Sequence, residues 1–306
     1  MKRMSEGLRM WVSVMLIFIA YAAIFIIFDD YDRKVKTPLD EANDWHLLLF
    51  SIVVMVGLGW LLYGYSKRMD LRIHRDQKEK QDEMRRELTQ NISHELKTPV
   101  ASILGYTDTI LDSPDISEQT KHQFILRTNA QARRLSSLLQ DISTLNKMDY
   151  ASHLLQKENV DISVLVTDII FESENILATK QMTCHNNLPQ NICVNGNWQL
   201  LYSIFRNLMD NAINYAGTGT TIDISAEQQS EKWHFTFTDN GAGVPSEHLS
   251  RIFERFYRVD KGRSREMGGT GLGLSIVKNA VLLHGGQISA YNEKNGGLCF
   301  DFTIKK

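Results

Sequence analysis

The sequence predicts two transmembrane helices, followed by an α-helical hairpin that dimerises as a four-helix bundle and then by an α+β sandwich. Two uncharged apolar runs within the first 66 residues indicate the transmembrane helices. Apolar residues at spacings of three and four along two later segments indicate the hairpin. Beyond residue 149, short alternating segments typical of strands are interleaved with helical ones, which indicates a mixed domain.

The composition limits the class of protein. A chain of 306 residues is long enough for about two globular domains, and its net charge of −2 gives no support for nucleic acid binding. The three cysteines, Cys184, Cys193 and Cys299, lack the spacing of a metal site or a disulfide framework. We therefore expect reduced thiols in a cytosolic portion.

The two apolar runs span residues 11–28 and 47–66, each close to the roughly 20 residues that cross a bilayer as a helix. Basic residues precede the first run and follow the second, whereas the intervening loop is mainly acidic. The positive-inside rule then places residues 1–10 and the C-terminus in the cytoplasm, as in a multi-pass protein of the cytoplasmic (inner) membrane. The alternatives are a cleaved signal peptide and a pair of buried soluble helices; neither accounts for both runs and their flanks.

The outer loop, residues 29–46, has only eighteen residues, too few for a folded sensor domain, which needs about 40. A stimulus is therefore expected to act on the transmembrane helices in the lipid bilayer, on this loop, or through a membrane or extracytoplasmic partner protein. Residues 67–87 are rich in helix formers and contain neither Gly nor Pro, which favours one continuous linker helix. A flexible charged linker is the alternative.

Residues 88–149 predict the hairpin. Its first helix has apolar positions from Ile92 to Ile110 and is expected to end at the turn cluster 112–115; Ser117 is expected to cap a second helix that ends near Met148. Such a hairpin cannot bury its apolar stripe alone, so pairing into a homodimeric four-helix bundle is expected. The second helix carries two series, Ile125, Ala132 and Leu139 and, offset by three, Thr128, Leu135 and Ile142.

One histidine of the first helix is predicted to face solvent. His94 is two residues from both Ile92 and Leu96, so it lies well away from the apolar stripe. Glu95 places a carboxylate beside it, and Pro99 cannot donate to the carbonyl of Glu95, so the helix is expected to kink or loosen there. A solvated surface histidine is the alternative to a functional one.

Residues 150–306 predict an α+β domain whose largely antiparallel sheet has helices on one face. Helices are expected over 163–179, over 197–215 with Asn197 as the cap, and over 274–283. Strands are expected over 222–226, 233–238, 287–291 and 298–304, with a hairpin turn at 295–297.

Four features of this domain carry chemistry. Asn207 and Asn211 share one helix face, where neutral carboxamides suit Mg²⁺ beside phosphates, although a polar helix face is the alternative. The segment 239–243 places a carboxylate at the end of a strand, where it can accept a hydrogen bond from an exocyclic amine of a base. The glycines beside it would let a flat base approach the backbone. An ordinary Asn-Gly turn is the alternative.

The other two features suit phosphate. The glycine-rich segment 268–274 leads into the N-terminus of a predicted helix, where free backbone N–H groups attract anions. The segment matches neither the P-loop nor the Rossmann pattern. Between the two glycine segments, residues 246–267 hold six Lys or Arg residues and predict a lid over phosphates. Phe253, Phe256 and Tyr257 are expected to dock this lid on the domain.

Five stretches in this order resemble the membrane sensor histidine kinases of bacterial two-component systems. The stretches are SHELKTP (93–99), NLMDNAINY (207–215), DNGAGV (239–244), IFERFYR (252–258) and GGTGLGL (268–274). The resemblance covers roughly residues 85–306 and is specific, because five separate motifs agree in order and spacing. It implies a Bergerat-type ATP-binding fold for the second domain, with ATP and Mg²⁺ bound there.

The resemblance also implies roles for residues. His94 is similar to the phosphoacceptor, Glu95 to the general base and Thr98 to the residue that positions water when a partner regulator is dephosphorylated. Asn211 resembles the direct Mg²⁺ ligand. The nucleotide contacts that it implies are Asn207, Asn211, Tyr215, Asp239, Gly241, Gly243, Arg258, Thr270, Gly271, Leu272 and Gly273.

The expected function is an ATP-dependent autokinase that phosphorylates His94 and passes the phosphoryl group to an aspartate of a response-regulator receiver domain. Asn214 stands where such proteins usually carry a basic residue near the triphosphate. The alternatives are a receptor that acts mainly as a regulator phosphatase or scaffold, and a non-kinase ATPase with the same cleft.

Overall fold

The computed structural model describes residues 44–113, 115–150, 156–260, 269–294 and 296–306, together with positions 19, 23, 26 and 30. It divides into two compact units, Met1–Glu87 and Leu88–Lys306. The first apolar run, 11–28, lies outside the described residues except at three of those positions. Among the residues described, no helix combines the length and the apolar character needed to cross a membrane.

Helix α2 runs over Asp44–Asp112 and contains both the second apolar run and the linker, so the predicted helix over 67–87 is confirmed. The helix continues through Pro99, which is buried. Helix α3 spans Glu118–Tyr150. The Ser117 hydroxyl accepts from the backbone N–H of Thr120 (3.2 Å), which confirms the predicted cap. Tyr106 and Phe124 stack across the two helices, with ring centroids 5.4 Å apart.

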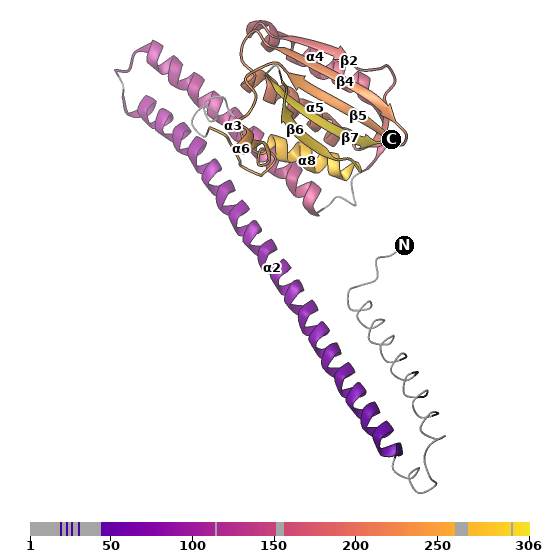
Figure 1. Cartoon of the computed structure of the whole chain (residues 1–306). Helices are drawn as coiled ribbons and strands as arrows, with labels where there is room; N and C mark the ends of the chain where they lie inside the picture. Colours follow the sequence, from indigo (N-terminus) through magenta and orange to yellow (C-terminus); the bar gives the residue numbers. More distant parts are fainter. Residues whose placement is uncertain are drawn as a thin grey trace. The chain divides into compact units, whose positions relative to one another are not determined.

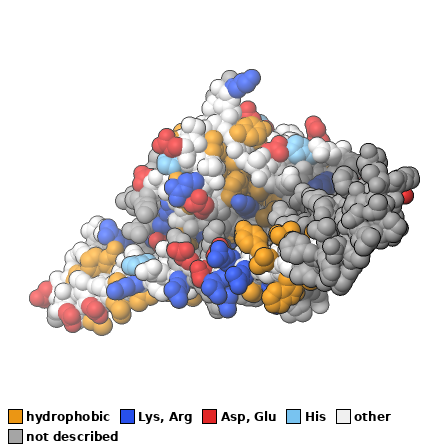
Figure 2. Space-filling model, turned by 60° about the horizontal axis from the view of Figure 1, so that its bottom comes forward, with side chains coloured by type: hydrophobic (Ala, Val, Ile, Leu, Met, Phe, Trp, Pro, Cys, Tyr) orange, Lys and Arg blue, Asp and Glu red, His pale blue; other side chains and the backbone are white. Residues whose placement is uncertain are grey.

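The apolar stripe of the hairpin is only partly covered within one chain. Leu138, Leu145 and Met148 are buried. Two members of the series on α3 remain open: Ile125 is 50% exposed and Leu139 52%. Figure 2 shows hydrophobic side chains exposed among charged ones on the face that it draws. The hairpin therefore keeps an apolar surface that its own chain does not bury.

The second domain begins after the hairpin. Its elements are β1 (Glu158–Asp161), α4 (Ile162–Thr179), β2 (Thr183–Asn187), β3 (Cys193–Gly196), α5 (Trp198–Tyr215), β4 (Thr221–Gln229), β5 (Lys232–Asp239), α6 (Ser246–Leu249), α8 (Gly273–Leu283), β6 (Ile288–Asn292) and β7 (Leu298–Lys305). The three predicted helices and four predicted strands are all present. The sequence prediction missed β1, β2, β3 and α6, which are short and mostly polar.

The main sheet has the strand order β2-β4-β5-β7-β6. Only β2 and β4 pair in parallel, and the other three pairs are antiparallel, as predicted. Figure 1 shows α4, α5 and α8 together on one face of this sheet. Strands β1 and β3 form a separate antiparallel pair.

The core lies between these helices and the sheet. Alternate residues of β5 point inward, so Phe235 stacks on Phe302 of β7 (5.2 Å between ring centroids), and Phe205 of α5 meets both rings. Each ring is at most 1% exposed. Burying a side chain of this kind is worth about 1.5–3 kcal/mol, so this cluster fixes α5 on the sheet.

Helix α5 is also fixed at its first turn. The Asn197 side chain accepts from the backbone N–H of Leu200 (3.1 Å), as predicted, while the backbone N–H of Asn197 donates to Nε2 of His284 (3.1 Å). His284 donates from Nδ1 to the Ala280 carbonyl (2.7 Å), so its ring must be neutral. Burial accordingly lowers the pKa of His284 below its ordinary value. These contacts hold the start of α5 against the end of α8.

Candidate active site

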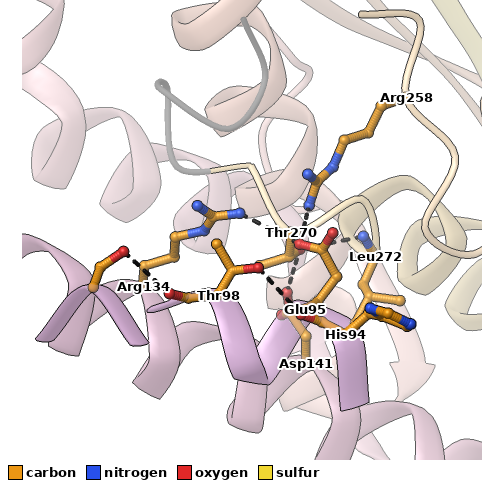
Figure 3. Close-up of polar contacts among 9 residues, drawn as sticks. His94, Glu95, Thr98, Arg134, Asp141, Arg258, Thr270 and Leu272 are labelled. Carbon is orange, nitrogen blue, oxygen red and sulfur yellow. Dashed lines mark hydrogen bonds and ion pairs between the residues drawn. The ribbon is translucent and has the colours of Figure 1, made fainter. Parts of the chain in front are cut away.

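His94 lies on α2 with its side chain exposed, as predicted. The Thr98 hydroxyl donates to the His94 carbonyl (3.3 Å), one helical turn along. The neighbouring Glu95 side chain is only 15% exposed. Figure 3 shows His94 and Glu95 leaving the helix in different directions, so that the imidazole is open while the carboxylate is enclosed.

The Glu95 carboxylate is enclosed by two arginines from different elements. Arg258, from the predicted lid, donates to its Oε2 (3.0 Å), and Arg134, from α3, lies 3.4 Å from the same oxygen. The two arginine side chains are 6% and 11% exposed. Removing one partner of such a buried cluster leaves an uncompensated charge, so the three side chains depend on one another.

Two further contacts join the second domain to the hairpin. The Thr270 hydroxyl, in the glycine-rich segment, donates to Asp141 of α3 (2.8 Å) and accepts from the backbone N–H of Leu272 (3.2 Å). Arg255 of the lid donates to Asp149 at the end of α3 (2.9 Å). The predicted nucleotide contacts Arg258 and Thr270 are therefore both bound to the hairpin in this arrangement (Figure 3).

The Asp141 carboxyl, on α3 of the hairpin, has a raised pKa. Burial raises its pKa to about 6; the hydrogen bond from Thr270 opposes that shift, and the negative charge of Asp210 adds to it. Because the pKa in the folded state lies above the ordinary 3.8, this carboxyl contributes stability that is fully present below pH 3.8 and is lost as the pH rises through about 6.

An Asp141→Asn substitution should therefore stabilise the protein at neutral pH. The neutral amide can still accept from Thr270, and it avoids the desolvated charge, so we expect a gain of about 2 kcal/mol at pH 7.5 that shrinks as the pH falls below 6. Denaturant unfolding of wild type and variant between pH 5 and 8 measures this difference. A gain that does not change with pH would contradict this account of Asp141.

Helix α5 presents its two asparagines differently. The Asn207 amide donates to the Ser203 carbonyl (2.7 Å), and its Oδ1 lies against the backbone of Gly273, only 2.5 Å from where a β-carbon would stand. Asn207 thus joins α5 to the glycine-rich segment. No described residue hydrogen-bonds to the Asn211 carboxamide, which is half-buried one turn further on. Of the pair, Asn211 has the side chain available to a ligand.

Asp239 ends β5 and is only 5% exposed. Its Oδ1 accepts from the backbone N–H groups of Gly241 (2.9 Å) and Leu298 (3.4 Å). Burial raises the pKa of Asp239, and these two hydrogen bonds oppose the shift. Gly241 must be glycine, because a β-carbon there would lie 2.4 Å from the carbonyl oxygen of Ala216. Since Ala216 follows Tyr215, the loop after Asp239 meets the end of α5.

Phe253 and Phe256 of the lid pack on the core of the domain, as the sequence predicts, and Phe253 lies edge-on against Phe300 (6.2 Å between ring centroids). The Tyr257 hydroxyl bonds instead to Nδ1 of His248 (2.6 Å), within the lid itself. The Phe256 N–H donates to the carbonyl of Gly271 (2.8 Å), and both residues have positive φ, 62° and 74°. Residues 261–268, the rest of the predicted lid and the start of the glycine-rich segment, lie outside the described residues.

The site suits the phosphates of a nucleotide. Arg258 uses one guanidinium nitrogen for Glu95, while its Nε is buried and has no hydrogen-bond partner among the described residues. This nitrogen lies beside Gly271, 3.2 Å from where a β-carbon would stand. A buried cationic donor without a partner, next to the start of α8, fits an anionic ligand.

The structure brings most of the predicted site residues into two groups. His94, Glu95 and Thr98 form the hairpin group, and Arg258 links it to a second group on α5, β5 and α8. Tyr215, at the end of α5, is 43% exposed. The sequence analysis missed the hairpin partners Arg134, Asp141 and Asp149. Arg134 and Asp141 are seven residues apart beside the apolar stripe, and this spacing could have indicated a shared polar face.

Comparisons with known proteins agree with this geometry. Residues 84–151 match the family described as His Kinase A (phospho-acceptor) domain. Residues 196–306 match the family described as histidine kinase-, DNA gyrase B-, and HSP90-like ATPase. The sensor-like histidine kinase SenX3 of Mycolicibacterium smegmatis is 33% identical over 270 residues, which cover 88% of this chain and 69% of that protein. The chain spans about half, 53%, of the mycobacterial relatives of the same name.

Solved structures have the same fold. Acinetobacter baumannii histidine kinase AdeS is 25% identical with a TM-score of 0.57, and the match covers 69% of this chain and 97% of that one. Histidine kinase ThkA in complex with response regulator protein TrrA is 23% identical with a TM-score of 0.57, over 72% of this chain and 61% of that one. A phospho-acceptor family followed by an ATPase family, together with a relative that is 33% identical over 88% of this chain, shows that the chain belongs to the sensor histidine kinases of two-component systems.

Proposed function

We propose that this protein-histidine kinase phosphorylates itself on His94 and passes the phosphoryl group to an aspartate of a response-regulator receiver domain. One observation supports His94 as the phosphorylated residue. The lid residue Arg258, which lies against the glycine-rich segment, reaches the residue next to His94 (3.0 Å to Glu95). Arg258 therefore joins the second domain to the segment of α2 that carries His94.

In the proposed reaction, a ring nitrogen of neutral His94 attacks the γ-phosphorus of ATP. An N–P bond forms, the bond to the β–γ bridging oxygen breaks, and ADP leaves. Glu95 accepts the proton from the other ring nitrogen, as an adjacent general base would. The remaining catalysis is positioning and charge stabilisation, which Arg258 and the α8 N-terminus supply.

ATP would lie between the Asp239 loop and the start of α8. Asp239 has one carboxylate oxygen without a described partner, which suits acceptance from an exocyclic amine. Asn211, with its unengaged carboxamide, would hold Mg²⁺, which neutralises phosphate charge when bound. Asn214, half-buried on α5, supplies no cation, so we assign the charge on that side to Arg258.

In the present arrangement, side chains that the proposed reaction needs are bound to other residues of the protein. Arg258 and Glu95 bind each other, and Thr270 binds Asp141. Phosphoryl transfer from ATP therefore requires these contacts to open first. The same arrangement leaves His94 and Thr98 exposed, which suits a second activity, dephosphorylation of the regulator with Thr98 positioning the water. The solved complex of ThkA with its regulator supports a receiver domain as the partner.

The test of the kinase proposal is incubation of the full chain with γ-labelled ATP and Mg²⁺. We expect label that is stable in base and lost in acid, as for phosphohistidine, and its transfer to a receiver domain. Chains that hydrolyse ATP without retaining label would instead indicate a non-kinase ATPase with the same cleft.

We further propose that the protein is a homodimer anchored in the cytoplasmic membrane with both termini inside. The exposed apolar stripe on the hairpin supports pairing of two hairpins into a four-helix bundle. The two uncharged runs and their basic flanks support the anchor. Sedimentation of the purified chain at twice the monomer mass tests the dimer. Recovery in the membrane fraction after a carbonate wash tests the anchor, and a chain released by that wash would overturn it.

A further inference from the structure

Asn292 is an exposed residue at the end of the edge strand β6, and its side chain bonds to a single main-chain unit of another element. Its Oδ1 accepts from the N–H of Val244 (2.9 Å), and its amide donates to the carbonyl of Val244 (2.6 Å). A carboxamide that pairs with both groups of one residue acts as a strand partner would. It fixes both the position and the orientation of the Val244 backbone.

Val244 ends the loop that begins at Asp239, and the two ends of this loop are held by different contacts. At its start, Asn240 exchanges hydrogen bonds with Thr221 through its backbone N–H (3.2 Å) and its Oδ1 (2.7 Å). Gly297 also packs directly on the backbone of Asp239. At its end, among the described residues, the main chain of 242–244 is hydrogen-bonded only by Asn292.

Gly243 shows how closely the two segments approach. Its φ is +70°, and a β-carbon there would lie 2.6 Å from Oδ1 of Asn292. The glycine therefore makes room for the Asn292 carboxamide in addition to allowing the turn. Val244 itself packs on the core, so the loop has one apolar contact and one polar clamp at this end.

From this geometry we propose that Asn292 is a positioning residue for nucleotide binding, because it holds the 239–244 loop in the shape that meets adenine. The inference rests on the proposed role of Asp239 at the adenine. A loop fixed before binding loses less conformational entropy when the ligand arrives, so its clamp raises affinity without touching the ligand. Because both hydrogen bonds to Val244 are exposed, water can replace the Asn292 carboxamide, and no buried polar group is left unpaired.

The experiment compares Mg·ADP and Mg·GDP affinities, by titration calorimetry, for the full-length wild type and for Asn292→Ala, Asn292→Asp and Asp239→Asn. Two hydrogen bonds of this kind predict an affinity for ADP about fivefold lower in Asn292→Ala, with GDP binding unchanged. Asn292→Asp keeps the acceptor for the Val244 N–H but loses the donor, so its loss should be intermediate. Asn186→Ala is the matched control, because Asn186 makes comparable side-chain bonds on β2 at the opposite edge of the sheet.

The outcomes separate this inference from the proposed function. If Asp239→Asn weakens ADP binding while Asn292→Ala stays within twofold of wild type, the adenine site stands and the positioning role is wrong. If Asp239→Asn leaves ADP binding unchanged, both are wrong. Equal losses of ADP and GDP affinity in Asn292→Ala, together with a lower unfolding temperature, would show a general structural role and overturn the inference.

Discussion

A His94→Gln variant should lose acid-labile phosphorylation by at least about a hundredfold, while its affinity for Mg·ADP stays at the wild-type level. The amide cannot form the N–P bond, and the exposed side chain makes no contact that the fold needs. Labelling with γ-labelled ATP and calorimetry on the same preparation measure the two properties separately.

His122→Gln is the control for this variant, because His122 is a second exposed histidine on the hairpin, on α3. It should label as wild type does. Retained acid-labile label in His94→Gln would move the phosphorylation site elsewhere. A loss of label in both variants would point to damage of the hairpin.

An Asn211→Asp variant should lose autophosphorylation by about a hundredfold. Here the defect lies in the nucleotide site, whereas in His94→Gln it lies in the phosphoryl acceptor. Its carboxylate adds a negative charge where the Mg²⁺ and the phosphates are expected, and a misplaced charge of this kind costs about 2–3 kcal/mol in transition-state stabilisation. Acceptance of a phosphoryl group from a phosphorylated receiver should stay intact, because the hairpin is unchanged.

The matched control is Asn175→Asp, which adds the same charge on an exposed site of α4 away from the cleft. Its labelling rate should stay within about twofold of wild type. A variant at position 211 that keeps its labelling rate would remove Asn211 from the metal site. Weaker ADP binding only in the presence of Mg²⁺ would give the role direct support.

Much of the cleft could be predicted from the sequence, because its chemistry sits in contiguous segments. The run from Asp239 to Gly243 and the run that ends at Gly273 each place turn glycines next to a regular element, and turn chemistry is local. Asn197 is predictable as a cap for the same reason. The exposure of His94 followed from the positions of Ile92 and Leu96 on the same helix.

The contacts between distant segments could not be predicted in this way. Glu95 and Arg258 are 163 residues apart, and Thr270 and Asp141 are 129 apart, so no local pattern relates them. Asn292 looks like an ordinary residue at the end of a strand until its partner, Val244, is known. Strand β2 was missed because its Thr-Cys-His-Asn-Asn sequence is polar at a sheet edge, where burial imposes no alternation.

The position of Glu95 between Arg134 and Arg258 affects how any change at this residue would act on the rate. On the proposed mechanism, losing the carboxylate would remove the proton acceptor and so slow the chemical step. It would also release the lid arginine and so favour the open form that the proposed step requires. The two effects have opposite signs, so the activity of a Glu95 variant reflects their balance. Arg258 has a comparable double role, because it both clasps Glu95 and is expected to bind phosphate. On this proposal, the Glu95–Arg258 ion pair would couple the rate of the chemical step to the population of the open form.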